Sequence, residues 1–368
     1  MSTLSDLEKE CICDAAGLAS RLSLSDTEKE RIGEIIRRYP LKVTPYYLGL
    51  IDEKDPQDPI RKLCIPDYSE YTDDGEEDTS GEASNTVVKG MQHKYSQTVL
   101  ILSTNKCASY CRHCFRKRLV GLSDDEIATH LGEMAEYIRL HPEITNVLIS
   151  GGDAFLNSNN RIKEYLDTFI DLDQLDLIRF GTRTPVVLPQ RITTDSELQD
   201  ILKEYNCKKQ LYVVTQFNHP NEITEEAVEA VRILLKAGIV VKNQTVLLND
   251  INDDPAILSA LFRRLTACGV VPYYIFQCRP VRGVLHNFQV PLRKGIRIIE
   301  KAMRMQNGQG KCLRYVMSHS YGKIEIIGEM EGKSMLFKYH QAKNSEKSGK
   351  IFVKDVEDGQ SWLESVPF

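Results

Sequence analysis

Short apolar runs alternate with longer amphipathic segments from Gln97 to Gln277. The runs are rich in β-branched residues, which is typical of strands buried on both faces of a parallel sheet. They read TVLILST, TNVLISG, LIRFGT, QLYVVTQF, IVVKNQTVLL and VVPYYIFQ. Segments such as SDDEIATHLGEMAEYIRLH and DPAILSALFRRLTACG lie between them and have the length and periodicity of helices. Six successive strand–helix units therefore predict a partial (β/α)6 barrel.

The flanking segments do not continue this pattern. Residues 1–45 are expected to be helical, with Ser25 as a helix cap. The acidic stretch 67–85 contains Gly and Ser and is expected to form a solvated connection. After Met305 the hairpin-like runs KIEIIGE and SMLFKYH replace the barrel units. The expected α/β fold thus has an N-terminal helical extension with its acidic connection at 1–90, a barrel at 91–305 and a small β-containing C-terminal tail at 306–368, the candidate oligomerisation segment once the family resemblance given below is considered.

Composition and charge narrow the function classes. The 368 residues carry a formal net charge of −5, without the basic excess that is typical of a nucleic-acid-binding protein. No run approaches the length of a membrane span, and the N-terminus lacks the pattern of a signal peptide. We therefore expect a cytoplasmic protein with reduced thiols. Most cysteines without a shared spacing are expected in the core: Cys11, Cys13, Cys64, Cys207, Cys268, Cys278 and Cys312.

Polar side chains follow the expected strands at their C-terminal ends, where the catalytic residues of such barrels collect. SGGD follows the second strand, GTRTP the third and TQFNHP the fourth, while NQT lies within the fifth and FQCRP ends the sixth. Their convergence on one rim predicts a single site.

Three cysteines with C-x3-C-x2-C spacing, Cys107, Cys111 and Cys114, follow the first expected strand. A structural zinc site needs four N or S ligands, and no second pair lies nearby. Three thiolates suit a [4Fe-4S] cluster in which one iron keeps an open coordination site. The spacing resembles the signature of the radical SAM superfamily. That resemblance implies S-adenosylmethionine (SAM) on the open iron, cleaved by one electron to a 5'-deoxyadenosyl radical.

The resemblance also implies residues that face SAM. They are Tyr110, His113, Ser150, Gly151, Gly152, Asp153, Arg183, Asn218 and His219.

Longer blocks resemble the lysine 2,3-aminomutase family of that superfamily. They include YPLKVTPYYLGLID, CRHCFRKR, LISGGDAFL, RTPVVLPQRIT, FNHPNEIT and PYYIFQC, in the family's order. The resemblance implies pyridoxal phosphate (PLP), which holds an amino acid as an imine while its amino group migrates from C2 to C3. It also implies a homo-oligomer and an electron donor such as flavodoxin or ferredoxin.

The match is uneven around the implied PLP. Arg116 is retained where the family binds the substrate carboxylate, and Lys94, Tyr95 and Gln244 match positions that face PLP. Thr98, however, replaces an arginine that binds the PLP phosphate. The only candidate for the imine lysine is Lys311, which lies in a shortened loop.

The charge of the side chain at the implied substrate position also differs from that in the family. Arg279 stands where the lysine enzymes place an aspartate for the distal ammonium, so lysine is a poor candidate. Arg116 and Arg279 together suit a molecule with two anionic ends, unless Arg279 pairs with an internal acid such as Asp153.

Three interpretations remain open. The first is a radical SAM enzyme that abstracts hydrogen from a small anionic amino acid or carboxylate without PLP. The second is a PLP-dependent 2,3-aminomutase acting on an acidic amino acid, with Lys311 as the imine lysine. The third is a non-catalytic iron–sulfur protein.

Overall fold

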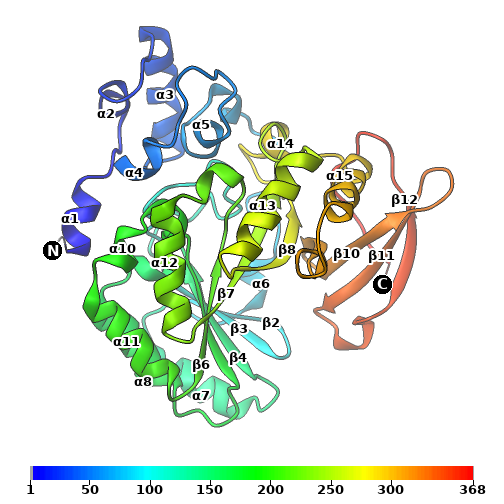
Figure 1. Cartoon of the computed structure of the whole chain (residues 1–368). Coiled ribbons are helices and arrows are strands. Elements are labelled where there is room, and N and C mark those ends of the chain that lie inside the picture. Colours follow the sequence, from blue (N-terminus) through cyan, green and yellow to red (C-terminus); the bar gives the residue numbers. More distant parts are fainter. Residues whose placement is uncertain (1–2, 368) are drawn as a thin grey trace.

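The computed structural model describes residues 3–367 and contains a single sheet of twelve strands in the order β1 to β12 (Figure 1). The six expected barrel strands are confirmed as β3 (Thr98–Thr104), β4 (Asn146–Gly151), β5 (Leu177–Gly181), β6 (Gln210–Thr215), β7 (Val240–Leu247) and β8 (Val271–Gln277). All are parallel, and β9 (Arg314–His319) adds a seventh parallel strand. β1 (Thr86–Val88) and β2 (Met91–Tyr95) pair antiparallel before β3. The sheet does not close on itself, so the barrel is partial.

Helices cover the outside of the curved sheet. The main ones are α7 (Leu131–Leu140), α8 (Asn159–Phe169), α11 (Ser196–Asn206), α12 (Glu225–Lys236), α13 (Pro255–Ala267) and α15 (Leu292–Arg304). Short helices α9 (Thr184–Val187), α10 (Gln190–Thr193) and α14 (Leu285–Phe288) follow strand ends, as do the 3-10 turns η2 (Ala154–Leu156) and η3 (Pro220–Glu222). Burial alternates along β4 and β7, because one face packs under the helices and the other faces the barrel interior.

The N-terminal extension is helical, as expected. It contains α1 (Leu4–Lys9), α2 (Ala15–Ala19), α3 (Asp26–Arg38), α4 (Pro45–Leu48) and α5 (Pro59–Cys64). Ser25 caps α3 in a capping box with Glu28, which confirms the predicted start of that helix. The extension bonds directly to the cysteine loop, since the Tyr110 amide donates to the Lys42 carbonyl at 2.8 Å and the Arg112 amide to the Leu63 carbonyl at 3.0 Å.

The expectation that residues 67–85 form a solvated connection agrees with the exposure of most of this segment, but it was wrong for two of its carboxylates. This segment contains η1 (Tyr68–Glu70) and α6 (Glu82–Asn85), and the Glu70 and Glu82 residues are only 1% and 4% exposed. Glu70 accepts hydrogen bonds from Arg112 at 2.6 Å and Lys117 at 2.6 Å. Glu82 pairs with Arg116 at 2.8 Å and Arg118 at 2.9 Å. Composition gave no sign of this, because the partners of the two carboxylates lie 34 to 47 positions further along the chain.

The C-terminal segment continues the sheet. β9 pairs with β8, and β10 (Gly322–Glu329), β11 (Ser334–Ala342) and β12 (Ile351–Asp355) follow in antiparallel order, so the predicted hairpin is confirmed. The turns η4 (Gln309–Lys311) and η5 (Ser345–Lys347) precede β9 and β12. The Lys94 ammonium, on β2, donates to the His319 carbonyl at 2.7 Å. The end of β9 therefore approaches β2 across the open side of the barrel.

The prediction for the unspaced cysteines was wrong for most of them. Cys64 and Cys278 are buried, whereas Cys11 and Cys268 are half-buried and Cys13, Cys207 and Cys312 are exposed. Three of these residues, Cys207, Cys268 and Cys312, cap the C-terminal ends of α11, α13 and η4, where the chain leaves the core.

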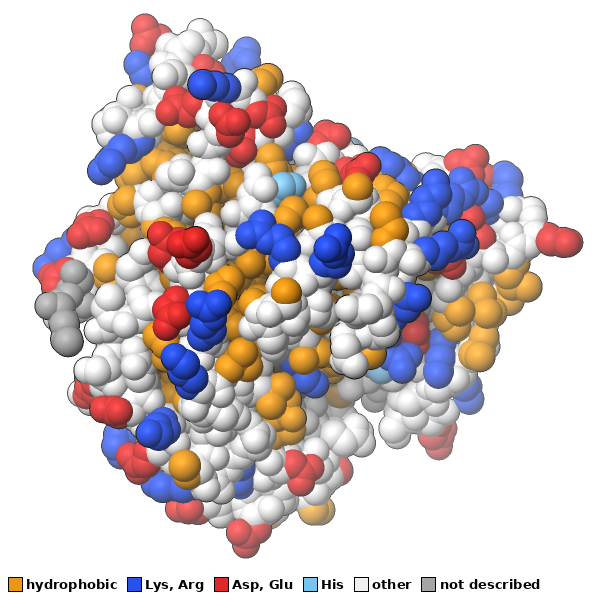
Figure 2. Space-filling view, viewed as in Figure 1, with side chains coloured by type: hydrophobic (Ala, Val, Ile, Leu, Met, Phe, Trp, Pro, Cys, Tyr) orange, Lys and Arg blue, Asp and Glu red, His pale blue; other side chains and the backbone are white. Residues whose placement is uncertain are grey.

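The outer surface carries interspersed acidic and basic side chains on the face shown in Figure 2. Within residues 3–367, no helix is long and apolar enough to cross a bilayer.

Replacing Glu70 with Gln should destabilise the protein by about 3–5 kcal/mol, because Arg112 and Lys117 would stay buried without their carboxylate. The measurement is the free energy of unfolding in urea. Glu77→Gln is the matched control, since Glu77 pairs with Arg282 at the surface and should matter by at most about 1 kcal/mol. Equal losses of unfolding free energy in the two variants would contradict the larger effect expected for the buried carboxylate.

Candidate active site

A cavity of about 540 Å³ extends from the cysteine loop into the barrel. Fourteen of the eighteen residues that the sequence assigned to the cluster, SAM, substrate or PLP line it: Lys94, Tyr95, Cys107, Cys111, His113, Cys114, Arg116, Ser150, Gly151, Gly152, Asp153, Arg183, Gln244 and Arg279. Tyr110, Asn218, His219 and Lys311 are not part of this lining. The rim predicted from the strand ends is therefore one site, with four of its proposed members outside it.

The cysteine loop brings three thiols to the cavity. Burial, with the nearby Asp153 carboxyl, raises the pKa of the Cys107 thiol, and burial together with Cys111 raises the pKa of Cys114 to about 11. The Arg183 guanidinium donates to the Cys111 sulfur at 2.8 Å. Among residues 3–367, no three His, Cys, Asp or Glu side chains are grouped so that they could hold one metal ion.

Two glycines let the end of β4 approach the cysteine loop. The Gly152 amide donates to the Thr104 carbonyl at 2.6 Å, and the Asp153 amide donates to the Lys106 carbonyl at 2.8 Å. A Cβ on Gly151 would lie 2.5 Å from the Thr104 oxygen, and the φ of Gly151 is +109°. A Cβ on Gly152 would lie 2.3 Å from the Lys106 oxygen. Only glycine fits both positions without moving the main chain of the loop.

Arg183 connects the cysteine loop to the N-terminal extension. Its guanidinium pairs with Glu222 at 2.5 Å and donates to the Tyr47 hydroxyl at 2.9 Å, while Tyr47 donates to Glu222 at 2.6 Å. Burial opposes the charge of Arg183, but Cys111, Tyr47 and Glu222 together hold the pKa of this guanidinium above its usual range. The side chain is thus fixed as a cation beside the thiols.

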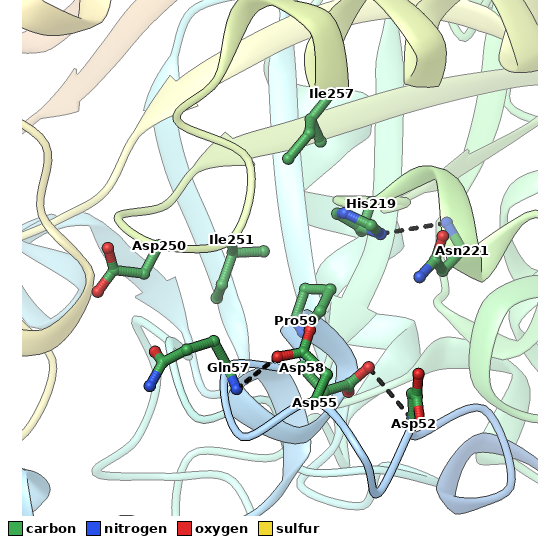
Figure 3. Close-up of a pocket in the computed structure, with 10 residues that line it drawn as sticks. All are labelled: Asp52, Asp55, Gln57, Asp58, Pro59, His219, Asn221, Asp250, Ile251 and Ile257. Carbon is green, nitrogen blue, oxygen red and sulfur yellow. Dashed lines mark hydrogen bonds between the residues drawn. The ribbon is translucent and has the colours of Figure 1, made fainter.

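Asn218 and His219 belong to the same loop as Glu222 but face elsewhere. Their amides donate to the Glu222 carboxylate at 2.5 Å and 3.0 Å. The His219 side chain lines a second, smaller pocket of about 330 Å³ together with Asp52, Asp55, Asp58 and Asp250 (Figure 3). Burial lowers the pKa of His219. The sequence-based assignment of both residues to SAM remains a prediction.

Two guanidiniums flank the Phe115 ring, with Arg279 at 4.1 Å and Arg116 at 4.5 Å from its centroid. Arg116 is paired with Glu82. Arg279 donates to the hydroxyls of Ser80 and Ser318, the latter at 2.8 Å, and forms no ion pair within residues 3–367. It does not pair with Asp153, whose carboxylate accepts from the Thr182 hydroxyl and the Arg183 amide.

The cavity is strongly basic. Its lining contains seven basic side chains, Lys94, Arg116, Arg179, Arg183, Lys242, Arg279 and Lys323, against two carboxylates, Glu82 and Asp153. Burial and neighbouring cations lower the pKa values of Lys94 and Lys323 to about 7 each. In the described part of the chain, neither lysine forms an ion pair, and neither does Arg179.

The chain matches the radical SAM superfamily over residues 101–261. It is 41% identical over 334 residues to an L-lysine 2,3-aminomutase of Clostridium subterminale, covering 86% of this chain and 79% of that protein. The protein belongs to the lysine 2,3-aminomutase family of radical SAM enzymes. It is also 39% identical over 291 residues to a glutamate 2,3-aminomutase of Clostridioides difficile (strain 630), covering 78% of this chain and 68% of that protein.

A solved structure of a radical SAM methyltransferase from Sphaerobacter thermophilus is similar at a TM-score of 0.40 and 15% identity, over 61% of this chain and 68% of that one. A similarity of this size carries no argument about the site.

Family membership implies a [4Fe-4S] cluster and SAM, and the site of this aminomutase-family protein fits such ligands. Cys107, Cys111 and Cys114 supply three thiols, and polar atoms beside them lack protein partners. The Ser109 hydroxyl, the His113 Nδ1 and the Thr215 hydroxyl are buried without a hydrogen-bond partner among residues 3–367. A buried polar group without a partner costs about 1–3 kcal/mol, so these atoms suit a polar ligand.

The deeper end of the cavity fits an anionic ligand such as PLP. Two donors, Arg179 Nε and Gln92 Nε2, are buried there without a hydrogen-bond partner in the described residues. Arg179 donates to Asn146 at 2.5 Å, and Asn146 donates to Thr98 at 3.0 Å. A guanidinium therefore lies near the position at which Thr98 replaces the expected arginine. Lys311 is exposed on η4, outside the cavity.

Sequence reasoning missed Arg179, Lys242 and Lys323 in this lining. Each is a charged residue within a strand, at a position whose neighbours on either side are buried. Because successive side chains in a strand point to opposite faces, such a residue must face an interior space or solvent. That signal was present in LIRFG, VVKNQ and KIEII.

Gly152→Ala should lower the thermal midpoint and the iron content after cluster reconstitution. The added Cβ meets the Lys106 carbonyl, a main-chain group that moves only with the cysteine loop, and overpacking of this kind costs about 1–3 kcal/mol. Gly132→Ala on α7 is the control, because nothing lies within 4 Å of its Cβ and a helical Ala should stabilise the protein by about 0.5–1 kcal/mol. Normal iron content in Gly152→Ala would contradict the tight packing of loop and strand.

Proposed function

We propose that this protein is an aminomutase-type radical SAM enzyme whose substrate is a small amino acid or carboxylate with an anionic group, and not lysine. Arg279 carries the proposal. Its guanidinium lines the cavity beside Phe115 and has hydroxyl groups but no carboxylate as partners. A cation in such a place is best stabilised by an anionic ligand.

Cys107, Cys111 and Cys114 would hold the cluster, and the open strand ends around Ser150 and Asp153 would hold SAM. When bound, these groups supply a carbon radical that removes a hydrogen atom from the substrate. The protein contributes binding and orientation. Arg183 keeps a fixed positive charge beside the thiols, and Arg116, held in place by Glu82, offers its outer NH groups to a substrate carboxylate.

The charge balance of the lining supports an anionic substrate over lysine. An ammonium group approaching Arg279, with Arg179 and Lys323 nearby, would be repelled at short range in a region of low dielectric. A second carboxylate would instead be attracted to Arg279 while Arg116 binds the first. The relative named glutamate 2,3-aminomutase supports an acidic amino acid as the class to test first.

Hydrogen abstraction without PLP was the first interpretation of the sequence. It was based on the loss of the arginine that binds the PLP phosphate and of a correctly spaced lysine. The second candidate, a PLP-dependent enzyme, is supported by a specific arrangement. Lys94, Arg179 and Lys323 are three basic groups without carboxylate partners at the deep end, which suits a phosphate dianion. Lys311 lies outside this end, so a PLP-dependent enzyme needs another lysine. Family membership disfavours the non-catalytic alternative.

The proposal also includes the electron donor and the oligomeric state. The single electron would come from a small donor protein such as flavodoxin or ferredoxin. The C-terminal strands would contribute to a homo-oligomer, as the resemblance to the family implies.

With anaerobically reconstituted enzyme, SAM and a reductant, acidic amino acids should stimulate formation of 5'-deoxyadenosine more than lysine does. Arg279→Gln should lower kcat/KM for the best acidic substrate about 10- to 100-fold, because a charge-assisted hydrogen bond contributes about 1.5–3 kcal/mol. Arg304→Gln, at an exposed position on α15, is the control. Preferential turnover of lysine by the wild-type enzyme would overturn the proposal.

A further inference from the structure

We propose that Lys323 is the lysine that forms a covalent C=N bond with an anionic carbonyl ligand in this cavity, of which PLP is the test compound. The inference deepens the proposed function and rests on its PLP-dependent form. Lys323 lies on β10, twelve positions after Lys311, and its side chain lines the same cavity as the cysteines.

The position of Lys323 is defined by contacts from three strands. Its ammonium lies 5.2 Å from the centroid of the Tyr95 ring on β2 and 5.1 Å from that of Tyr274 on β8. It donates one hydrogen bond, to the Gln341 side-chain oxygen on β11 at 3.1 Å. A lysine on a paired strand between two aromatic rings is held more rigidly than one on a loop.

The surroundings also favour the free amine, which is the nucleophilic form. Burial lowers the pKa of Lys323 to about 7, and the like charges of Arg179, Lys94 and Arg279 act in the same direction. Relative to an ordinary lysine, this increases the free-amine fraction at pH 7 by on the order of a thousandfold. Desolvation and a neighbouring cation are the two usual means by which proteins activate a lysine.

The other two lysines are less suitable. Lys94 has a similarly lowered pKa of about 7, but its ammonium donates to two main-chain carbonyls, those of Ser80 at 3.1 Å and His319 at 2.7 Å. It therefore connects β2 to its neighbours and is not free to react. Lys311 is exposed on η4, which precedes β9. Since β9 starts beside Tyr274, in the middle of β8, η4 lies toward the start of β8, away from the cysteine rim.

The cations near Lys323 indicate an anionic ligand. Arg179, with its unpartnered Nε, and Arg279, with its hydroxyl partners only, can neutralise a phosphate or carboxylate carried by the carbonyl compound. In the reaction, the Lys323 amine adds to the carbonyl carbon and one water molecule leaves. The C=N bond replaces the C=O bond, and no oxidant or reductant is consumed.

The test uses the full-length chain as purified, mixed with equimolar PLP in the dark, reduced with borohydride, digested and mapped by mass spectrometry. The expected result is a pyridoxyl group on Lys323. Lys323→Arg, which keeps the charge, and Lys323→Ala should each lose about 90% of the total label, whereas Lys311→Ala should be labelled like the wild type. Thermal midpoints verify that each variant is folded, and Lys323→Arg guards against a folding defect in Lys323→Ala.

Two results would overturn the inference: a wild-type protein that is not labelled, or one labelled chiefly on Lys94, Lys311 or another lysine. Unchanged total labelling in Lys323→Arg would do so too. Labelling does not depend on the cluster, so it separates this inference from the proposed function. A protein labelled on Lys323 that cleaves no SAM with any acidic amino acid supports the inference while overturning the function.

Discussion

Burial of two carboxylates beneath the cysteine loop is the constraint on which the rest of the site depends. The loop sequence CRHCFRKR carries four basic residues, and a loop so charged would otherwise extend into solvent. Glu70 and Glu82 each form ion pairs with two of them, so the two buried carboxylates compensate half of this charge. Pairs this deeply buried contribute less to stability than to geometry, because their desolvation offsets most of their attraction. They fix where the three thiols face the cavity.

The same pairing determines the charge of the cavity. Glu82 is committed to Arg116 and Arg118, and Asp153 is committed to main-chain and hydroxyl donors, so neither is available to the other cations. The lining therefore keeps an excess of positive charge in a chain whose net charge is −5. The outer surface carries both acidic and basic side chains, whereas the cavity lining is basic. The net charge of the chain therefore does not indicate which ligand is bound, but the charge of the lining does.

The sequence predicted the parts of the fold that repeat. Strands β3 to β8 follow from local patterns and were found as expected, and most of the residues at their ends line one cavity, although Asn218 and His219 do not. The connection 67–85 was misjudged because an acidic composition describes a solvated segment and a buried ionic one equally well. Its partners are brought near only by the fold. Lys323 was missed for a related reason, since Lys311 was the one residue of the C-terminal tail assigned to the site and the hairpin that follows it was given no part in it.

Family membership and the structure point to different lysines as the one that forms the C=N bond. Identity of 41% to a lysine 2,3-aminomutase establishes the ancestry of the barrel, yet Lys311, the only lysine in the corresponding loop, lies outside the cavity. A reactive lysine needs an apolar or cationic environment and access to the ligand, and neither requirement specifies a loop or a strand. Because β9 and β10 close the open side of the barrel against β2, a residue on β10 meets both requirements. On the inference drawn above, Lys323 of the neighbouring hairpin supplies the amine that the shortened loop before β9 does not.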